Sequence, residues 1–333
     1  MKFIYVQSTY PLFLGVYLKQ KGENVCFLYT RQKYKEVIHS LNIESQHIKL
    51  PTYNDYFLRP GFVKRKIYEV NQIIGTNDLI FTHVQFAVFL FVLLFNRLKK
   101  SRSIFYNYEP LTRNTITIID RGYYFKDYIL ALIWKNVLKF FFRTETVLSL
   151  YNKTFFLSIN HNYFDKCNVV NAKVDINFEK LQFEVLRNIQ FNHPSIDNLY
   201  VTGSEIQYKD KLYDTNSIDD IVTFVENNNI SVKPHPSGYP YPKSKSIISP
   251  YIPTEFLFKV ITHSIISINS TTLIAASNYY EMNSSVKIIC LLKLVKYLDK
   301  ESYIEMLNRI LSRSKNNILF PETIQELILI LGS

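Results

Sequence analysis

Short apolar runs alternate with longer amphipathic segments along most of this chain. The short runs are typical of buried strands, and the longer segments are typical of helices that cover them. Regular alternation of the two indicates parallel βαβ units and a doubly wound sheet. In the first half of the chain we predict strands at 3–7, 25–29, 79–84, 103–108 and 115–120, and helices at 12–21, 31–41, 86–98 and 126–142.

The alternation becomes irregular over 144–192 and then restarts, which indicates a boundary near 185–195. A chain of 333 residues is long enough for two domains of ordinary size. We therefore predict an α/β protein with one domain at 1–188 and another at 189–333. In the second domain we predict strands at 198–202, 230–233, 264–268 and 286–292, and helices at 217–227, 253–262, 271–279, 300–313 and 321–331.

The composition is that of a globular protein, with 47% hydrophobic residues and no tract that suggests disorder. The three cysteines, Cys26, Cys167 and Cys290, match neither a disulfide framework nor zinc-ligand spacing. We expect a reducing compartment, the cytoplasm, and no structural metal. The first eight residues suit a strand better than a signal peptide. The longest apolar run, 86–95, is about half of a membrane span.

The formal net charge of +11 favours anionic partners such as a nucleotide, an acidic sugar or a membrane surface. The alternative is an ordinary solvated surface rich in lysine. Nucleic acid is not expected, because no basic stretch is interleaved with glycine and aromatic residues. Basic clusters at 64–66 and 97–102 are candidates for contact with anionic lipid. The run 128–143, which contains Trp134, is another candidate, although it also suits an ordinary core helix.

The segment 230–277 contains a histidine between two prolines, in Lys233-Pro234-His235-Pro236. A proline disfavours helical conformation in the residue before it, so the imidazole is expected to project from a stiff, extended strand end. With its near-neutral pKa, a histidine there can donate a proton to a departing phosphate. A second copy, His193-Pro194, precedes a predicted strand near the domain boundary. We interpret it as a turn histidine.

Two further polar clusters follow in the same segment. Ser270, Thr271 and Thr272 lie between an apolar strand and a helix, where hydroxyl groups cap helices and the free N–H groups bind anions. Glu255 lies in the first turn of the predicted helix 253–262, where the helix dipole favours a carboxylate. A carboxylate also suits a ribose diol. Since ligands bind beyond the carboxyl ends of parallel strands, these clusters and His235 predict a nucleotide site.

A fourth cluster lies in the first half of the chain, where Asp120-Arg121-Gly122 ends the predicted strand 115–120. An aspartate at a strand end is a candidate general base. It is equally typical of a turn in which glycine supplies a positive φ. The residues alone leave both interpretations open.

The ordered motifs resemble those of the bacterial sialyltransferases, in particular the polysialyltransferase and lipooligosaccharide sialyltransferase groups. The matching residues are Lys-Pro-His-Pro, then Ser-Pro-Tyr-Ile-Pro-Thr-Glu at 249–255, then Asn-Ser-Thr-Thr at 269–272. The resemblance covers roughly 116–277, and the first hundred residues agree in architecture only. It implies two Rossmann-like domains facing a cleft, the GT-B type of glycosyltransferase. It also implies CMP-sialic acid as donor, a glycan acceptor, and neither a metal nor another cofactor.

The resemblance also implies a role for each residue that matches a motif. The first domain would bind the acceptor and supply the base, and the second domain would bind CMP. The family's second acidic position is Arg121 here, which weakens the match at that point. The implied roles are Asp120 as general base, Gly122 in the first turn, His235 as the group that binds and protonates the leaving CMP phosphate, Lys233 and Pro236 beside it, Ser270, Thr271 or Thr272 as further phosphate ligands, and Glu255 on the ribose hydroxyls.

The sequence therefore predicts an inverting sialyltransferase of capsule or lipooligosaccharide synthesis, peripheral on the cytoplasmic face of the inner membrane. The first alternative is another envelope transferase with a CMP- or CDP-activated donor, because Kdo transferases and poly(glycerol-phosphate) polymerases share a Lys-x-His-Pro motif. The second is a basic membrane-surface or partner-binding protein with a vestigial two-Rossmann fold. Acceptor specificity is expected in loops 50–75 and 107–114, with His83 and Glu109 as acceptor-side candidates.

Overall fold

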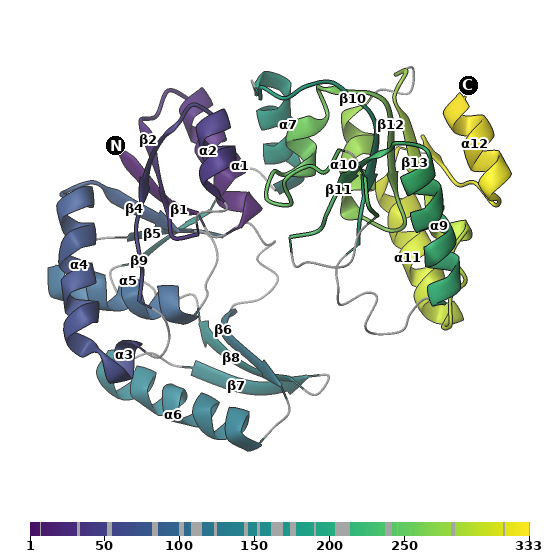
Figure 1. The fold of residues 1–333 in the computed structure, drawn as a ribbon. Coiled ribbons are helices and arrows are strands. Elements are labelled where there is room, and N and C mark those ends of the chain that lie inside the picture. The colour runs from purple at the N-terminus through teal and green to yellow at the C-terminus, as the bar shows by residue number, and fades with distance from the viewer. Residues whose placement is uncertain are drawn as a thin grey trace. The chain divides into compact units, whose positions relative to one another are not determined.

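The chain forms two compact units, Met1–Asn188 and Ile189–Ser333 (Figure 1). The computed structural model describes residues 1–6, 8–31, 34–51, 55–81, 86–99, 103–107, 115–122, 125–142, 146–151, 154–160, 169–173, 178–189, 191–203, 214–236, 242–244, 246–280, 284–315 and 317–332.

The first unit is built on a parallel sheet in the order β3-β2-β1-β4-β5-β9. The chain starts in the middle, at β1, and adds strands first on one side and then on the other, as a doubly wound sheet does. The strands are β1 (Lys2–Val6), β2 (Val25–Tyr29), β3 (Glu44–His47), β4 (Asp78–Phe81), β5 (Ser103–Asn107) and β9 (Val169–Lys173). The accompanying helices are α1 (Thr9–Gln20), α2 (Lys35–Ser40), α3 (Asp55–Leu58), α4 (Pro60–Ile74), α5 (Phe86–Lys99) and α7 (Phe178–Asn188).

Close packing of α1 against the sheet depends on Gly15. A Cβ atom at this position would lie 2.2 Å from a ring carbon of the buried Phe27 on β2. Glycine is therefore required for the helix to approach this strand. On its other side α1 packs against α7, where Lys21 lies 3.6 Å from Glu184.

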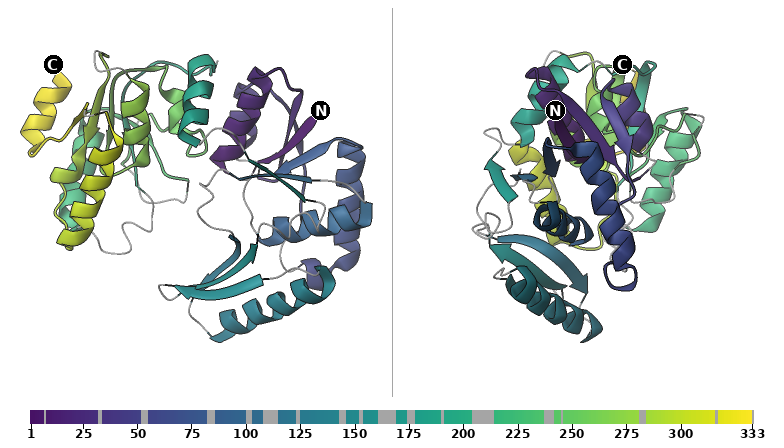
Figure 2. Two further views of the ribbon diagram at one scale, coloured as in Figure 1. Left: turned by 180° about the vertical axis from the view of Figure 1, so that it is seen from behind. Right: turned by 90° about the vertical axis from the view of Figure 1, so that its left-hand side faces the viewer.

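A second, antiparallel sheet lies in the same unit, with strands in the order β6-β8-β7 and α6 (Phe125–Phe142) along it (Figures 1 and 2). Its strands are β6 (Thr115–Gly122), β7 (Thr146–Tyr151) and β8 (Thr154–Asn160). The prediction that 115–120 belongs to the doubly wound sheet is therefore wrong. A short apolar run suits either kind of sheet, and the strands that pair with β6 lie in the segment whose pattern is irregular.

The strand β6 extends through Gly122, which lies opposite Thr154 of β8, and residues 123–124 after it lie outside the described residues. The predicted acceptor loop 50–75 is wrong over most of its length, because α4 occupies 60–74. The helix buries Val63, Ile67 and Val70 on one face, a spacing of three and four residues that fits a helix. His83, Glu109, Cys167 and the loop segment 108–114 lie outside the described residues.

The second unit is a parallel sheet in the order β11-β10-β12-β13-β14. This confirms the predicted α/β class with two Rossmann-like domains. Because the strand order reverses at β10, right-handed crossovers put α9 on the opposite face from α10 and α11. The elements are β10 (Ile196–Val201), α9 (Thr215–Asn227), β11 (Ser231–Lys233), η4 (Thr254–Leu257), β12 (Ile261–Ser267), α10 (Thr271–Tyr279), β13 (Lys287–Cys290), η5 (Leu291–Lys293), α11 (Lys300–Arg313), β14 (Ile318–Leu319) and α12 (Ile324–Gly332).

The predicted helix 253–262 is wrong. Its residues form η4, a single 3₁₀ turn, and then the start of β12. Phe256, Leu257 and Phe258 are all buried, so the segment has no solvent-facing side of the kind that an amphipathic helix needs. Glu255 therefore lies in a short turn, without the dipole of a full α-helix. Among the described helices, none is both long and apolar enough to cross a membrane.

Candidate functional site

The carboxyl ends of three neighbouring strands of the second unit carry most of the predicted site. In the order β11-β10-β12, the strands lead directly into His235, Thr202 and Ser270 respectively. Neighbouring parallel strands end at the same edge of a sheet, so these residues lie side by side there. The fold therefore brings the His-Pro motif and the hydroxyl cluster to one edge.

Thr202, which the sequence analysis missed, fixes the backbone of the His-Pro motif. Its N–H donates to the carbonyl of Lys233 at 3.1 Å, and its Oγ1 accepts from the N–H of His235 at 2.9 Å. The Thr202 side chain is buried. The signal in the sequence was a threonine at the end of a predicted strand, directly before Gly203.

Lys233 is buried, with only 3% of its surface exposed. Its ammonium group donates to the carbonyls of Pro234 at 3.2 Å and Pro250 at 3.0 Å. Burial lowers the pKa of Lys233 to about 8, and the charge of Glu255 acts in the opposite direction. Lys233 thus ties the His-Pro segment to the loop before η4 and supplies a buried positive charge, which makes it a positioning residue.

The charge of Lys233 affects the pKa values of the two other ionisable groups of the site, His235 and Glu255. Burial lowers the pKa of the half-buried His235, and the positive charge of Lys233 lowers it further. Burial raises the pKa of Glu255, while a backbone hydrogen bond and the charge of Lys233 oppose this rise. Burial and the charge of Lys233 thus both favour the neutral imidazole of His235. Pro236 beside it is exposed.

The three hydroxyl groups at the start of α10 have different environments. Ser270 is the N-cap, and its Oγ accepts from the N–H of Thr272 at 3.2 Å. The Thr272 side chain is buried, whereas Thr271 is exposed. Thr271, exposed at the amino end of the helix, is the member best placed to meet an anion from solvent.

His193, the other histidine followed by proline, lies before β10, at the amino end of that strand. It is therefore on the edge of the sheet opposite His235. Its ring stacks on Phe191 with centroids 6.4 Å apart, and its Nδ1 lies 2.9 Å from the carbonyl oxygen of Pro194. These local contacts are those of a turn histidine.

Asp120 and Arg121 belong to β6 in the first unit, and the structure describes their backbone. Asp120 lies opposite Phe156 of β8 in the antiparallel register. The register shifts between Thr117 and Ile119, which is a β-bulge of the kind that redirects a strand and the side chains after it.

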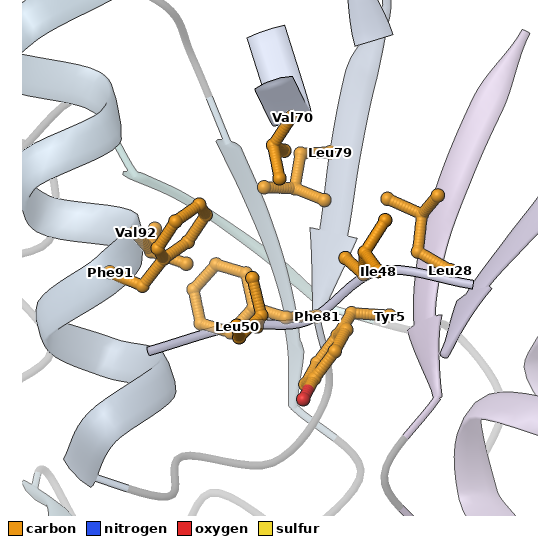
Figure 3. A pocket seen from close by; sticks show the side chains of 9 residues that line it. All are labelled: Tyr5, Leu28, Ile48, Leu50, Val70, Leu79, Phe81, Phe91 and Val92. Atoms are coloured by element: carbon orange, nitrogen blue, oxygen red, sulfur yellow. The ribbon is translucent and has the colours of Figure 1, made fainter. Parts of the chain in front are cut away.

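Among the described residues, each unit also contains a hollow. In the first unit an apolar cavity of about 10 Å³ is lined by side chains that include Tyr5, Phe81 and Phe91 (Figure 3). A cavity this small holds at most about one water molecule, so it is a gap in the packing of the core. In the second unit an open hollow of about 610 Å³ lies beyond β13 and β14, lined by Lys293, Val295, Tyr297, Lys300, Tyr303 and Glu322.

This second hollow lies on the same sheet edge as His235. Met306 connects it to the hydroxyl cluster, because its Sδ lies 3.2 Å from Nδ2 of Asn269 and 3.6 Å from the hydroxyl of Tyr297. Lys293 and Glu322 in its wall form an ion pair at 2.5 Å. Within the described residues, no group of three or more His, Cys, Asp or Glu side chains is placed to hold a metal ion.

Comparison with known proteins gives only distant structural likenesses. No protein-family model and no curated protein matches the chain. A UDP-GlcNAc 2-epimerase from Methanocaldococcus jannaschii has 12% identity and a TM-score of 0.43, over 100% of this chain and 92% of that one. The calicheamicin glycosyltransferase CalG4 has 9% identity and a TM-score of 0.41, over 100% of this chain and 90% of that one. The Escherichia coli ADP-heptose lipopolysaccharide heptosyltransferase II has 7% identity and a TM-score of 0.42, over 99% of this chain and 98% of that one.

Proposed function

We propose that this chain is an inverting, metal-independent glycosyltransferase of the GT-B type that transfers sialic acid from CMP-sialic acid to a cell-surface glycan. The observation that supports the proposal most strongly is the carboxyl edge of the second unit. In this unit His235 and the start of α10 offer groups that can hold a phosphate, and Glu255 offers a carboxylate whose pKa responds to the charge of Lys233. The cytidine base and the sialic acid are inferred from the motif resemblance.

His235 and Thr271 act on the leaving phosphate. A phosphate that binds beside His235 raises its pKa, because the anion favours the imidazolium form. The histidine therefore takes up a proton as the nucleotide binds. The imidazolium and the N–H groups of α10 then stabilise the negative charge that develops on the phosphate as the glycosidic bond breaks.

Glu255 holds the ribose. An ionised carboxylate accepts hydrogen bonds from both hydroxyls of a diol. Burial raises the pKa of Glu255, and the charge of Lys233 opposes that rise and so supports the ionised form. Lys233 donates to the carbonyls of Pro234 and Pro250, so it also holds the backbone beside His235 and in the loop before Glu255. Its role is to position His235 and Glu255.

Asp120 is the proposed general base. The acceptor hydroxyl gives its proton to the aspartate while its oxygen attacks the anomeric carbon of sialic acid. The bond from that carbon to the CMP phosphate breaks in the same displacement, and the phosphate keeps the electron pair and receives the proton of His235. A single displacement inverts the anomeric configuration. Asp120 takes this role from the motif resemblance, and Arg121 marks the point where the motif differs.

The assay measures release of CMP from CMP-sialic acid in the presence of glycan acceptors, and the two His-Pro motifs provide a matched pair of variants. His235→Ala should lower kcat by about 100-fold or more, because it removes the charge stabilisation on the leaving group. Asp120→Asn should lower kcat to a similar degree. His193→Ala, which changes the same residue type on the opposite edge of the sheet, should leave kcat unchanged. Full activity of the His235→Ala and Asp120→Asn variants would contradict the assigned roles.

The choice of nucleotide needs a separate measurement, because Glu255 and His235 recognise ribose and phosphate whatever the base. Thermal unfolding in the presence of CMP, CDP, CDP-glycerol, UDP and ADP ranks the nucleotides. CMP should give the largest rise in Tm, and His235→Ala should abolish that rise. Stabilisation by CDP-glycerol alone would reassign the chain to glycerol-phosphate transfer, and no stabilisation by any nucleotide would exclude the proposed donor site.

A further inference from the structure

Helix α6 buries one side against the rest of the first unit. Ala131, Trp134 and Leu138 on this side are at most 4% exposed, and Trp134 and Leu138 belong to the core that includes residues of β1, β4 and α5. The helix also lies along the antiparallel sheet (Figure 2). Trp134 therefore cannot contact lipid, and that part of the sequence-based prediction for 128–143 is wrong.

The opposite side of α6 is apolar as well. Ile129, Ile133 and Phe140 are 39%, 46% and 81% exposed, and their spacing of four and seven residues places them on one face. At about 100° per residue this face points directly away from Ala131 and Leu138. The outward face of a helix in a globular protein normally carries polar residues, so an apolar stripe there indicates an interaction surface.

Lysines border the stripe. Lys126 lies along one side of it, and the exposed Asn136 followed by Lys139 lies along the other. Lys126 and Lys139 are exposed, and Lys135 is partly buried. An apolar stripe bordered by lysines is complementary to a bilayer, whose acyl region accepts the stripe and whose phosphate groups accept the lysines.

We propose that the outward face of α6 rests on an anionic lipid bilayer, with the helix axis in the plane of the membrane. Ile129, Ile133 and Phe140 enter the boundary between headgroups and acyl chains, and Lys126 and Lys139 bind lipid phosphates. The 18 residues of α6 extend over about 27 Å. The net charge of +11 adds attraction for an anionic surface. This inference does not depend on the proposed transferase activity.

Flotation of the full chain with phosphatidylcholine vesicles, with and without phosphatidylglycerol, tests the apolar stripe. The wild type should float with the anionic vesicles, and the double variant Ile133→Ser/Phe140→Ser should bind them about tenfold or more weakly because it loses apolar burial. Leu329→Ser is the matched control, since Leu329 on α12 is 72% exposed but belongs to the second unit, and its binding should equal that of the wild type. Circular dichroism checks that each variant is folded.

A second pair of variants tests the lysines and the depth of insertion. Lys126→Glu/Lys139→Glu should remove the preference for anionic vesicles, and added salt should do the same to the wild type. Phe140→Trp should shift its fluorescence to the blue on vesicles, whereas the single native tryptophan, the buried Trp134, should not respond. Equal vesicle binding by Ile133→Ser/Phe140→Ser and the wild type would overturn the proposal. A concentration-dependent dimer that the same variant abolishes would assign the face to a second copy of the chain.

Discussion

Buried Lys233 controls the electrostatics of the candidate site at the scale of single residues. Its ammonium group is held by two carbonyl oxygens and has almost no contact with solvent. Its charge lowers the pKa of His235 and opposes the rise in the pKa of Glu255. A single side chain thus adjusts both groups that the proposed mechanism assigns to the nucleotide.

The pKa of Lys233 predicts how stability depends on pH. In the folded protein it is lowered from 10.5 to about 8, so between these values the unfolded chain binds more protons than the folded chain. The free energy of unfolding should therefore rise with pH across this window through Lys233. Urea unfolding of the wild type and of Lys233→Met between these pH values measures the effect as a difference. A constant difference would contradict the lowered pKa.

Lys233→Met should also be less stable than the wild type near pH 7. The substitution leaves the carbonyls of Pro234 and Pro250 without their donor, at a cost of about 1–3 kcal/mol, although removal of a buried charge offsets part of it.

The lowered pKa of His235 predicts proton uptake when CMP binds. The pKa of the imidazole is lowered in the free protein and rises beside the phosphate, so affinity should be higher below neutral pH and fall as the pH rises through the pKa of the bound state. Calorimetric titration with CMP in buffers of different ionisation enthalpy measures the uptake. The variant His235→Asn should remove the dependence of the binding enthalpy on the buffer. A wild type with the same binding enthalpy in every buffer would contradict the prediction.

At the scale of elements, helices with clear local signals were predicted well. The predicted helices 271–279 and 300–313 coincide with α10 and α11, and the predicted strand 25–29 coincides with β2. The start of α10 is marked by Ser270, whose side chain caps the helix. The antiparallel strands β7 and β8 were missed, although Tyr151 and Thr154 pair across only two intervening residues, a spacing typical of a hairpin.

At the start of α10, Ser270 caps the helix and Thr271 is the proposed phosphate ligand. The sequence alone did not distinguish these two roles. Ser270→Ala removes the N-cap hydrogen bond and should lower the free energy of unfolding by about 1 kcal/mol. Thr271→Ala, one residue along on an exposed position, should change stability little but weaken CMP binding. Chemical denaturation and calorimetric titration of both variants give the comparison. Equal loss of stability in the two variants would contradict this division.

Contact between α1 and β2 gives a prediction for packing. Gly15→Ala places a methyl group 2.2 Å from the Phe27 ring, and such overpacking should cost about 1–3 kcal/mol of unfolding free energy. Gly61 in α4 is a matched control, because a Cβ there has no atom within 4 Å. Gly61→Ala should leave stability unchanged or raise it by up to about 1 kcal/mol. Thermal denaturation of both variants measures the difference, and a neutral Gly15→Ala would show that the helix can shift away from the sheet.

At the scale of the whole molecule, the chain consists of two α/β units, and the proposed chemistry draws on both. The residues of the proposed nucleotide site lie within the second unit, and the proposed membrane face lies on α6 of the first unit. The positive net charge suits both the anionic donor and the anionic lipid.

The sequence by itself determined the α/β class, most of the parallel strands, and the residue types of the His-Pro and hydroxyl clusters, because these depend on local periodicity and backbone restriction by proline. Only the tertiary structure decided which side of α6 is buried, that β6 belongs to an antiparallel sheet, and that Thr202 and Pro250 hold the His-Pro motif. Each of these depends on partners distant in sequence, so the physical reason is long-range pairing and burial, which no local pattern contains.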